Sequence, residues 1–415
     1  MKGLFWLRDD LRFHDHPVLR QFSEECEHGF FIWTPTRSFS RAGPRRRQFI
    51  LASVLEFQKK AQDRGAVCLI SHLPVQDLFP ALLEKTQVQK IYFSSAITHE
   101  ELEDEQRVRE LGLPIVTRDT GALIAPDNLP MTISAVPESF TKFRTSVEPT
   151  LRIDPPAADP LNLPSWESTE IELLCPLPAD FLKTSVRPHL QLRGGESFGL
   201  SRVHDYIWAA DALKSYKQTR NGLLNWNDSS KISPWLAVGA LSARFVFAEI
   251  QRYEENRVRN ESTYWLFFEL LWRDYFRLIA QKWGAQFFVG KTKVNRLPPV
   301  KTLEVDDLFD RWCQGLTEDD FVNANMRELS QTGWMSNRGR QNVASYLCKQ
   351  LGVDWRRGAA YFEQQLIDYD PCSNWGNWAY QAGAGQDARD RAFDTQKQAA
   401  LYDPDLRYRK LWLGY

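Results

Sequence analysis

Short apolar runs alternate with amphipathic stretches over the first 125 residues of the chain. The runs have the length of buried strands and lie at 3–7, 29–34, 66–71, 90–94 and 114–117. Stretches with helical periodicity lie between some of them, at 45–63, 76–86 and 100–111. This alternation predicts an α/β domain with a doubly wound parallel sheet. No GxGxxG follows the first run, so the usual dinucleotide-binding fingerprint is absent.

The chain changes character twice after this region. Proline recurs between residues 126 and 195 with little periodicity, which is typical of a long connection draped over a surface. From residue 196 to the end the pattern is helical and rich in aromatic residues. We therefore expect an α/β domain over 1–128, a linker over 129–195 and an all-α domain over 196–415.

One helix of the second half should be buried. Ser262 to Trp283 is apolar on nearly every side, and its exceptions include the charged residues at 269, 273, 274 and 277. Glu269 and Arg273 lie four positions apart and could pair. Such a pair in an apolar helix suits a functional site or a tether between helices, and the pattern alone leaves both open.

Composition narrows the chemistry of the second half. Twelve of the 15 tryptophans lie beyond residue 200, whereas the last of the seven histidines is His204. This excludes Ser-His-Asp, Cys-His and histidine-ligated metal chemistry contained in that half. The charge is balanced, with 52 Lys and Arg against 53 Asp and Glu, so a polyanionic partner would need a local basic surface.

Cysteine use and hydropathy indicate the compartment. The six cysteines form no CxxC pair or zinc spacing, which is typical of reduced thiols. The N-terminus meets charge too early for a signal peptide, and no run of about 18 apolar residues could span a membrane. A cytoplasmic protein is the expectation.

Two segments could bind phosphate. Tyr216 and the stretch Asp228 to Trp235 combine hydroxyls with a helix start at Ser233 and Pro234, which fits either a phosphate site or a plain capped helix. The triplet Arg45-Arg46-Arg47 opens a helix and is read as a solvated face rather than a phosphate site.

Two further segments carry polar and aromatic groups together. Trp334 to Asn342 lies in a basic stretch with interleaved aromatics, which suits a nucleic-acid surface or a solvated helix face. In Asp368 to Tyr380, an Asp-x-Asp pair precedes three aromatics. It could hold a divalent metal, orient a polar ring, or form a packed turn.

Together these segments resemble the cryptochrome/DNA photolyase family, most closely its DASH branch. The resemblance covers nearly the whole chain, from Trp6-Leu7-Arg8-Asp9-Asp10-Leu11-Arg12 to Tyr402-Asp403-Pro404. Long ordered matches lie at 272–276, 325–329 and 335–342. The resemblance implies an N-terminal α/β antenna-type domain and a C-terminal helical domain that binds FAD and DNA.

The resemblance also implies a set of FAD-binding residues. They are Tyr216, Ser229, Ser230, Lys231, Ile232, Ser233, Glu269, Arg273, Trp334, Asn337, Arg340, Asp368, Asp370 and Asn374. Asn374 corresponds to the residue beside flavin N5, where the family's photolyases favour the fully reduced flavin. Under this interpretation the metal hypothesis for Asp368 and Asp370 is dropped, and no metal is expected.

The implied activity is blue-light-driven repair of cyclobutane pyrimidine dimers. The expected catalytic residues are Glu269, Trp272, Asn337, Gln341, Asn374 and Tyr380. Trp272 would stack on the flipped dimer, and Glu269 would hydrogen-bond it. Tyr380 and Gln341 stand where the best-known double-strand photolyases place Trp and Met, and this pair points to single-stranded DNA.

Two positions depart from the family pattern. Trp378 and Trp355 match the proximal and middle tryptophans of the electron-transfer chain, but the distal position is Thr302, for which Trp283 or Trp312 could substitute. Folate-binding DASH proteins carry Glu just before a Val-Thr pair, where this chain has Ala96. This departure argues against a folate antenna.

The expectation is thus a monomeric, FAD-dependent lyase acting on dimer-containing, mainly single-stranded DNA. The alternative is a DASH-type blue-light photoreceptor with weak or no repair activity. A light-independent nucleic-acid-binding protein with structural FAD is a third class.

Overall fold

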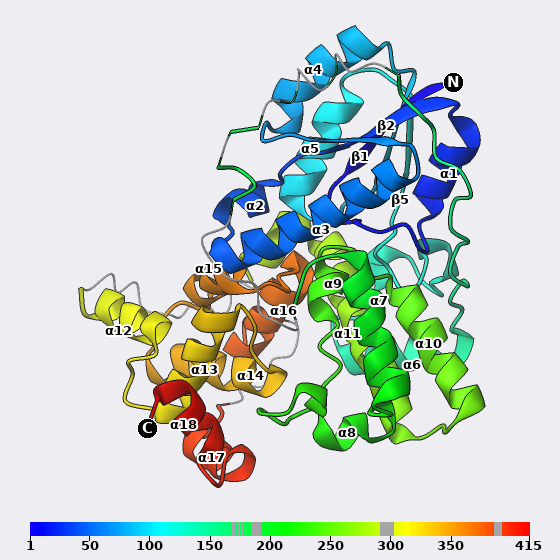
Figure 1. The fold of residues 1–415 in the computed structure, drawn as a ribbon. Coiled ribbons are helices and arrows are strands. Elements are labelled where there is room, and N and C mark those ends of the chain that lie inside the picture. The colour runs from blue at the N-terminus through cyan, green and yellow to red at the C-terminus, as the bar shows by residue number, and fades with distance from the viewer. Residues whose placement is uncertain are drawn as a thin grey trace. The chain divides into compact units, whose positions relative to one another are not determined.

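The chain folds into two compact units in the computed structural model (Figure 1). The structure describes residues 1–167, 171, 175, 177–178, 180–183, 192–290, 303–385 and 392–415. The α/β unit comprises Met1–Leu129, Leu151–His204 and Ile232–Arg252, and the helical unit comprises Pro130–Thr150, Asp205–Lys231 and Tyr253–Tyr415. Each unit thus includes part of the expected linker, and the domain boundaries at 128 and 195 stay a prediction.

A five-stranded parallel sheet forms the centre of the α/β unit. Its strands are β1 (Lys2–Leu7), β2 (His28–Trp33), β3 (Val67–Ile70), β4 (Lys90–Ser94) and β5 (Ile115–Arg118). Their order is β3-β2-β1-β4-β5, with every neighbouring pair parallel. The five apolar runs therefore correspond to the five strands, and the predicted doubly wound parallel sheet is confirmed.

Eight α-helices of the described residues belong to the α/β unit, and some of them pack on the sheet and bury its side chains. The eight are α1 (Pro17–Glu25), α2 (Arg37–Arg41), α3 (Pro44–Asp63), α4 (Val75–Thr86), α5 (His99–Arg109), α7 (Glu196–His204), α9 (Ser233–Ala237) and α10 (Ala243–Asn256). One core cluster joins Leu4, Trp6 and Ile32 of the strands to Phe79 and Leu82 of α4. Helices α3, α4 and α5 match the predicted stretches, whereas α1 and α2 were not predicted, although Val18, Leu19 and Phe22 of α1 are spaced as one helical face.

The arginine triplet at the start of α3 differs from its predicted role. Arg46 is only 6% exposed, and its guanidinium donates to the backbone oxygen of Ser38 at 3.2 Å. The interpretation of the whole triplet as a solvated face was therefore wrong for Arg46. Its side chain holds the turn between α2 and α3, which a charge pattern along the sequence does not reveal.

The helical unit contains ten α-helices among the described residues. They are α6 (Phe140–Val147), α8 (Tyr216–Thr219), α11 (Glu261–Trp283), α12 (Leu303–Gln314), α13 (Asp320–Thr332), α14 (Asn337–Ser345), α15 (Trp355–Gln365), α16 (Pro371–Ala382), α17 (Thr395–Tyr402) and α18 (Arg407–Leu413). The predicted buried helix is α11, and Asn260 caps its start by accepting from the backbone of Ser262 and Thr263. The all-α character predicted for this half is confirmed.

Helix α6 lies inside the segment where no periodicity was recognised. Its buried residues are Phe140, Phe143 and Val147, which are spaced as one helical face. That spacing was present in the sequence, but the surrounding prolines masked it. The helix matters because it packs against α11.

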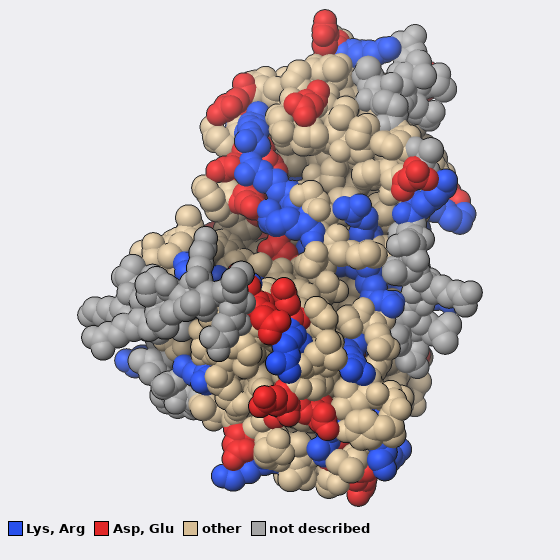
Figure 2. All heavy atoms as spheres, turned by 90° about the vertical axis from the view of Figure 1, so that its left-hand side faces the viewer, with Lys and Arg blue, Asp and Glu red and all other residues tan. Residues whose placement is uncertain are grey.

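Surface charge is mixed. Figure 2 shows basic and acidic side chains interspersed on the face drawn, in keeping with the balanced composition. No helix among the described residues is both long and apolar enough to cross a membrane.

Candidate active site

One face of α11 forms a wall of a cavity in the helical unit. Glu269, Trp272, Arg273 and Phe276 lie three or four positions apart, so their side chains leave the helix on the same side. The cavity has a volume of about 290 Å³. The helix with the charged exceptions in its sequence therefore supplies charged and aromatic groups to one cavity.

Helix α16 forms a second wall, and a glycine allows its close approach to α11. A Cβ atom on Gly376 would lie 2.3 Å from the ring of Phe276, so only glycine fits between the two helices. The packing brings the ring of Tyr380 to 6.1 Å from that of Trp272, at an interplanar angle of 75°. Two aromatic groups predicted to face the substrate thus meet edge to face.

Helix α14 supplies the polar groups Asn337 and Gln341 to the cavity. Its first turn is fixed by Ser336, whose hydroxyl accepts from the backbone of Gly339 at 3.0 Å. Gly339 is required as well, because a Cβ there would lie 2.0 Å from the Asn325 side chain. The Oε1 atom of Gln341 is buried and has no hydrogen-bond partner in the described part of the chain. A buried acceptor of this kind needs a donor from a bound molecule or water.

Glu269 forms an ion pair with a residue that the sequence analysis did not select. Its Oε1 lies 2.9 Å from the guanidinium of Arg220, which also lines the cavity. The expected partner was Arg273, four residues along the same helix, and Arg273 instead approaches Asp274 at 4.0 Å. The sequence could not identify Arg220, because it lies 49 positions earlier in the chain, just beyond α8.

Burial raises the pKa of the Glu269 carboxyl, and the positive charge of Arg220 acts in the opposite direction. The side chain is 30% exposed, but the space it faces is the cavity. The carboxyl thus keeps its proton to a higher pH than a carboxyl in bulk water.

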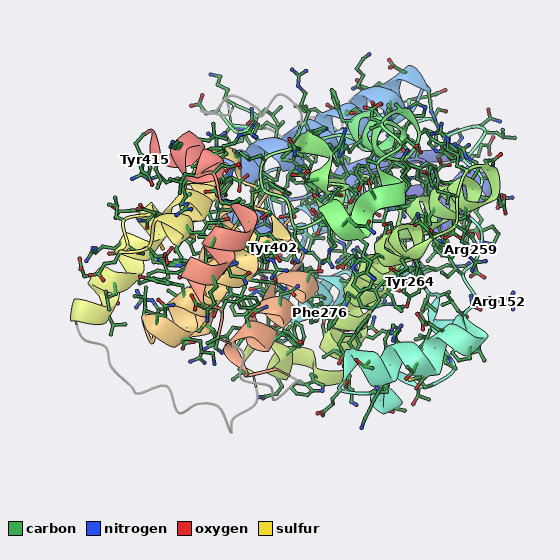
Figure 3. All side chains as sticks on the ribbon, turned by 90° about the horizontal axis from the view of Figure 1, so that it is seen from below. Arg152, Arg259, Tyr264, Phe276, Tyr402 and Tyr415 are labelled. Carbon is green, nitrogen blue, oxygen red and sulfur yellow. The ribbon has the colours of Figure 1, made fainter. Side chains whose placement is uncertain are left out.

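Phe140 of α6 stacks on Trp272. The two ring centroids are 3.7 Å apart and the rings are nearly parallel, at 12°. Tyr264, on the same helix as Phe276 (Figure 3), anchors α6 further by donating to Glu148 at 2.5 Å and accepting from Arg144 at 2.7 Å. Phe140 thus fixes the orientation of Trp272, a role that the sequence analysis missed because it treated this segment as a linker.

The Asp-x-Asp pair is occupied by structural contacts. Arg340 donates to both carboxylate oxygens of Asp368, at 3.0 and 2.8 Å, and Asp370 caps α16 by accepting from the backbone of Ser373. Asn374 is buried and donates to the backbone oxygen of Ala359 at 3.0 Å. Among the described residues, no cluster of three His, Cys, Asp or Glu side chains could hold a metal ion.

The expected phosphate-binding segment divides between the two units, with its residues up to Lys231 in the helical unit. Tyr216 is buried at the start of α8, and burial raises the pKa of its hydroxyl. Ser230 is buried and Ser229 is half-buried. Lys231 has a positive φ of 50° and places its ammonium 4.7 Å from the ring centroid of Trp334. Ile232 and Ser233 belong to the α/β unit, where Ser233 begins α9.

The cavity therefore unites part of the predicted site. Six predicted residues line it: Glu269, Trp272, Arg273, Asn337, Gln341 and Tyr380. Seven lining residues were not predicted: Arg220, Phe268, Phe276, Ser373, Asn377, Gln381 and Phe393. Four of the lining residues lie on one face of α16, so the helical spacing 373, 377, 380 and 381 was the available signal. The other predicted contacts lie outside its lining.

These residues fit a flat, polar cofactor. The cavity offers two guanidinium groups, aromatic rings and the unpartnered Gln341 Oε1. Such a combination suits a ring system that both stacks and hydrogen-bonds. Glu269, Arg273 and Asn337 are the predicted FAD contacts in this lining, so one edge of the expected flavin is compatible with the cavity, whose remaining groups can hold a second flat, polar ring system.

Comparisons with known proteins agree with this fit. Residues 3–162 match the family model "DNA photolyase", and residues 265–414 match "FAD binding domain of DNA photolyase". Cryptochrome DASH of Gloeobacter violaceus is 43% identical over 99% of this chain and 85% of the relative. Cryptochrome DASH of Xenopus laevis is 38% identical over 98% of this chain and 81% of the relative.

Solved structures give the same result for the fold. The crystal structure of the Synechocystis cryptochrome superposes with a TM-score of 0.92 at 39% identity, covering 100% of this chain and 88% of that one. A photolyase from Sulfolobus tokodaii superposes at 0.80 with 24% identity over 100% and 90% of the two chains, a likeness of fold alone. The chain therefore belongs to the DASH branch of the cryptochrome/DNA photolyase family, and its helical domain is an FAD-binding domain.

Proposed function

We propose that this protein is a light-driven lyase that splits cyclobutane pyrimidine dimers, mainly in single-stranded DNA. The cavity carries the proposal, because it gathers a carboxyl of raised pKa, an aromatic platform and polar side chains from three helices. We further expect the protein to act as a monomer in the cytoplasm. No folate antenna is proposed, since Ala96 replaces the glutamate of folate-binding relatives.

FAD, when bound, supplies the light-driven electron that opens the dimer. Its proposed contacts are the fourteen residues named from the resemblance. Arg340 and Asp368 hold each other through two hydrogen bonds, so both side chains are already oriented before the cofactor binds. Asn374, held through its amide to Ala359, keeps a fixed side-chain orientation beside the proposed flavin position.

The preference for single strands follows from the cost of extracting the dimer. Flipping the lesion out of a duplex costs a few kcal/mol, which is smallest in a single strand. Trp272 recovers part of this cost by stacking. Tyr380 and Gln341 present smaller, more polar surfaces than the Trp and Met that they replace, and so recover less of the cost.

In this proposal Glu269 donates a hydrogen bond to a carbonyl oxygen of the dimer and stabilises the negative charge that the dimer gains. Burial raises its pKa and favours the protonated, donating form over the ion pair with Arg220. The repair yield should therefore be full below this pKa and fall as the pH rises through it, because the carboxylate can no longer donate.

The Glu269→Gln variant should repair with a yield independent of pH in this range, since its amide always donates. The measurement is dimer loss per absorbed photon against pH, at constant FAD content. Glu261→Gln is a matched control on the same helix, because Glu261 is 77% exposed and pairs with Lys217. If the repair yield of Glu269→Gln falls with pH as that of the wild type does, the titrating group is not Glu269.

The function itself is tested with one preparation. Protein purified in the dark should show a flavin spectrum, and after reduction it should remove dimers from a single-stranded oligonucleotide faster than from the matching duplex. A flavin spectrum without dimer loss would favour the photoreceptor alternative. Equal repair of both substrates would contradict the inference that Tyr380 and Gln341 favour single-stranded DNA. Absence of flavin would overturn the whole proposal.

A further inference from the structure

The sequence lacks a tryptophan at the distal position of the chain that should deliver electrons to the flavin. Trp378 and Trp355 occupy the proximal and middle positions, while the distal one is Thr302, which lies outside the described residues. The following inference rests on the proposed function, because it assumes that these two tryptophans reduce a flavin bound in the helical unit.

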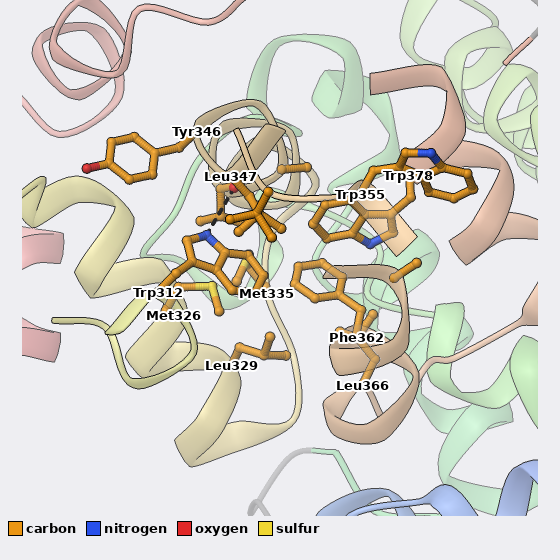
Figure 4. Packing of buried hydrophobic residues seen from close by; sticks show 14 of the residues in the cluster. Trp312, Met326, Leu329, Met335, Tyr346, Leu347, Trp355, Phe362, Leu366 and Trp378 are labelled. Atoms are coloured by element: carbon orange, nitrogen blue, oxygen red, sulfur yellow. Dashed lines mark hydrogen bonds between the residues drawn. The ribbon is translucent and has the colours of Figure 1, made fainter. Parts of the chain in front are cut away.

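The terminal donor of such a chain must be accessible to solvent. An oxidised indole loses its N–H proton, and an external reductant must reach it. Trp378 and Trp355 are each 3% exposed and belong to one buried cluster on the packed helices α15 and α16 (Figure 4). Neither can complete the transfer at the surface, so a further donor is needed.

Trp375 meets this requirement. Its ring centroid lies 5.8 Å from that of Trp355, at an interplanar angle of 76°. The side chain is partly exposed, and its indole N–H donates to the hydroxyl oxygen of Tyr369 at 3.2 Å. Trp375 also lies on α16 with Trp378, three residues earlier, so one helix fixes both rings.

The two substitutes considered from the sequence fit less well. Trp312 contacts Trp378 itself, with 6.1 Å between centroids, and is fully buried with its N–H bonded to the Val343 carbonyl. A backbone carbonyl cannot take up the proton, and a cation there would be desolvated. Trp283 is the last residue of α11, and Trp375 is the tryptophan whose ring packs against Trp355 at 5.8 Å between centroids.

The Trp312 branch continues to a phenol that is blocked in the same way. Tyr361 lies 5.7 Å from Trp312 between centroids, and its hydroxyl donates to the carbonyl of Cys313 at 3.0 Å. Tyr361 and Trp375 are both partly exposed, so the two branches differ in their proton acceptors. The Tyr361 hydroxyl donates to a backbone carbonyl, which cannot take up a proton, whereas the Trp375 N–H donates to a hydroxyl, which can pass a proton on.

We propose that Trp375 is the terminal electron donor of this protein. One electron passes from Trp375 to oxidised Trp355, which has itself returned one electron to oxidised Trp378. Trp375 thereby becomes oxidised, and its N–H proton passes to water by way of the Tyr369 hydroxyl that accepts it. An external thiol then returns one electron and one proton to Trp375 and is oxidised in turn.

The test is the rate at which blue light bleaches the oxidised-flavin absorbance in the presence of dithiothreitol without oxygen. Trp375→Phe, which keeps an aromatic ring against Phe288, should lose most of this rate. Trp312→Phe and Tyr361→Phe, which interrupt the other branch, should retain the parent rate. Parent-like bleaching by Trp375→Phe, or slow bleaching in either of the other two variants, would overturn the assignment.

Two further measurements do not depend on that rate. In the parent, the tryptophan radical seen by transient absorption should decay faster as the thiol concentration rises; insensitivity would indicate a buried radical and contradict Trp375. In the dark, Trp375→Phe should lose part of the tryptophan fluorescence that iodide quenches, and an unchanged quenchable fraction would show that Trp375 is not exposed.

Chemical reduction separates this inference from the proposed function. Dithionite supplies electrons without the tryptophans, so Trp375→Phe reduced in this way should repair dimers like the parent. If neither protein repairs, the lyase proposal fails, while the bleaching rates still decide whether Trp375 is the donor.

Discussion

Trp272→Ala is expected to weaken the binding of a dimer-containing single strand by about 10- to 100-fold. Stacking on an aromatic side chain contributes about 1–3 kcal/mol per base, and each 1.4 kcal/mol is a factor of ten in Kd. Trp272 lines the cavity with one ring face supported by Phe140, so the stacking surface is preorganised. The measurement is a binding isotherm with a fluorescent oligonucleotide that contains one dimer.

The controls divide this effect into its parts. Trp272→Phe keeps a ring and should recover much of the affinity, and an undamaged oligonucleotide should bind all variants alike. Phe140→Ala leaves Trp272 in place without its support and should give a smaller loss than Trp272→Ala, at unchanged FAD content. Equal affinity of wild type and Trp272→Ala would remove the stacking platform from the proposal.

The parts of the fold and of the site that the sequence could predict depend on regular spacing of residues within one short segment. The five strands follow from apolar runs, and α11 follows from its continuous apolar surface. The cavity face at 269, 272, 273 and 276 uses only the helical period. Identity of the individual site residues came from the family resemblance, because periodicity places a side chain on a face without giving its chemistry.

The parts that escaped prediction depend on contacts between distant segments. Arg220 pairs with Glu269 across 49 positions, and Phe140 stacks on Trp272 across 132. The neighbour of Trp355 is Trp375, which no sequence spacing associates with electron transfer. Each partner is fixed by the packing of two helices, and packing is the level at which a single sequence carries least information.

Arg12 is the extreme case of such a long-range contact. It lies in the stretch that opens the family resemblance, yet its guanidinium is 1% exposed and serves as an internal link of the α/β unit. It donates to four backbone carbonyls, those of His14 and Asp15 nearby and of Thr120 and Gly239 far along the chain. The four distances lie between 2.8 and 3.1 Å.

Gly239 makes this link possible by its own conformation. Its φ is +63°, and a Cβ there would lie 2.1 Å from the backbone oxygen of Asp9. Only glycine lets the chain approach closely enough for the Gly239 carbonyl to reach Arg12. The arginine thus joins three segments of the α/β unit that share no regular hydrogen-bonded element.

Arg12→Met should therefore destabilise the α/β unit by about 3–5 kcal/mol, because each buried carbonyl that loses its donor costs about 1–3 kcal/mol and part of this is recovered by local rearrangement. Methionine fills much of the space but leaves four buried carbonyls without their donor. For a unit of this size the loss corresponds to a fall in Tm of roughly 10 °C or more. The measurement is thermal unfolding followed by circular dichroism.

Arg20→Met is the matched control, because Arg20 forms an exposed ion pair with Glu24 on α1 and should cost less than about 1 kcal/mol. A Tm for Arg12→Met within a few degrees of the control would mean that the four carbonyls find other donors. The expected difference between two arginines with the same charge follows from burial alone, since water can replace an exposed guanidinium but does not reach the carbonyl partners of a buried one.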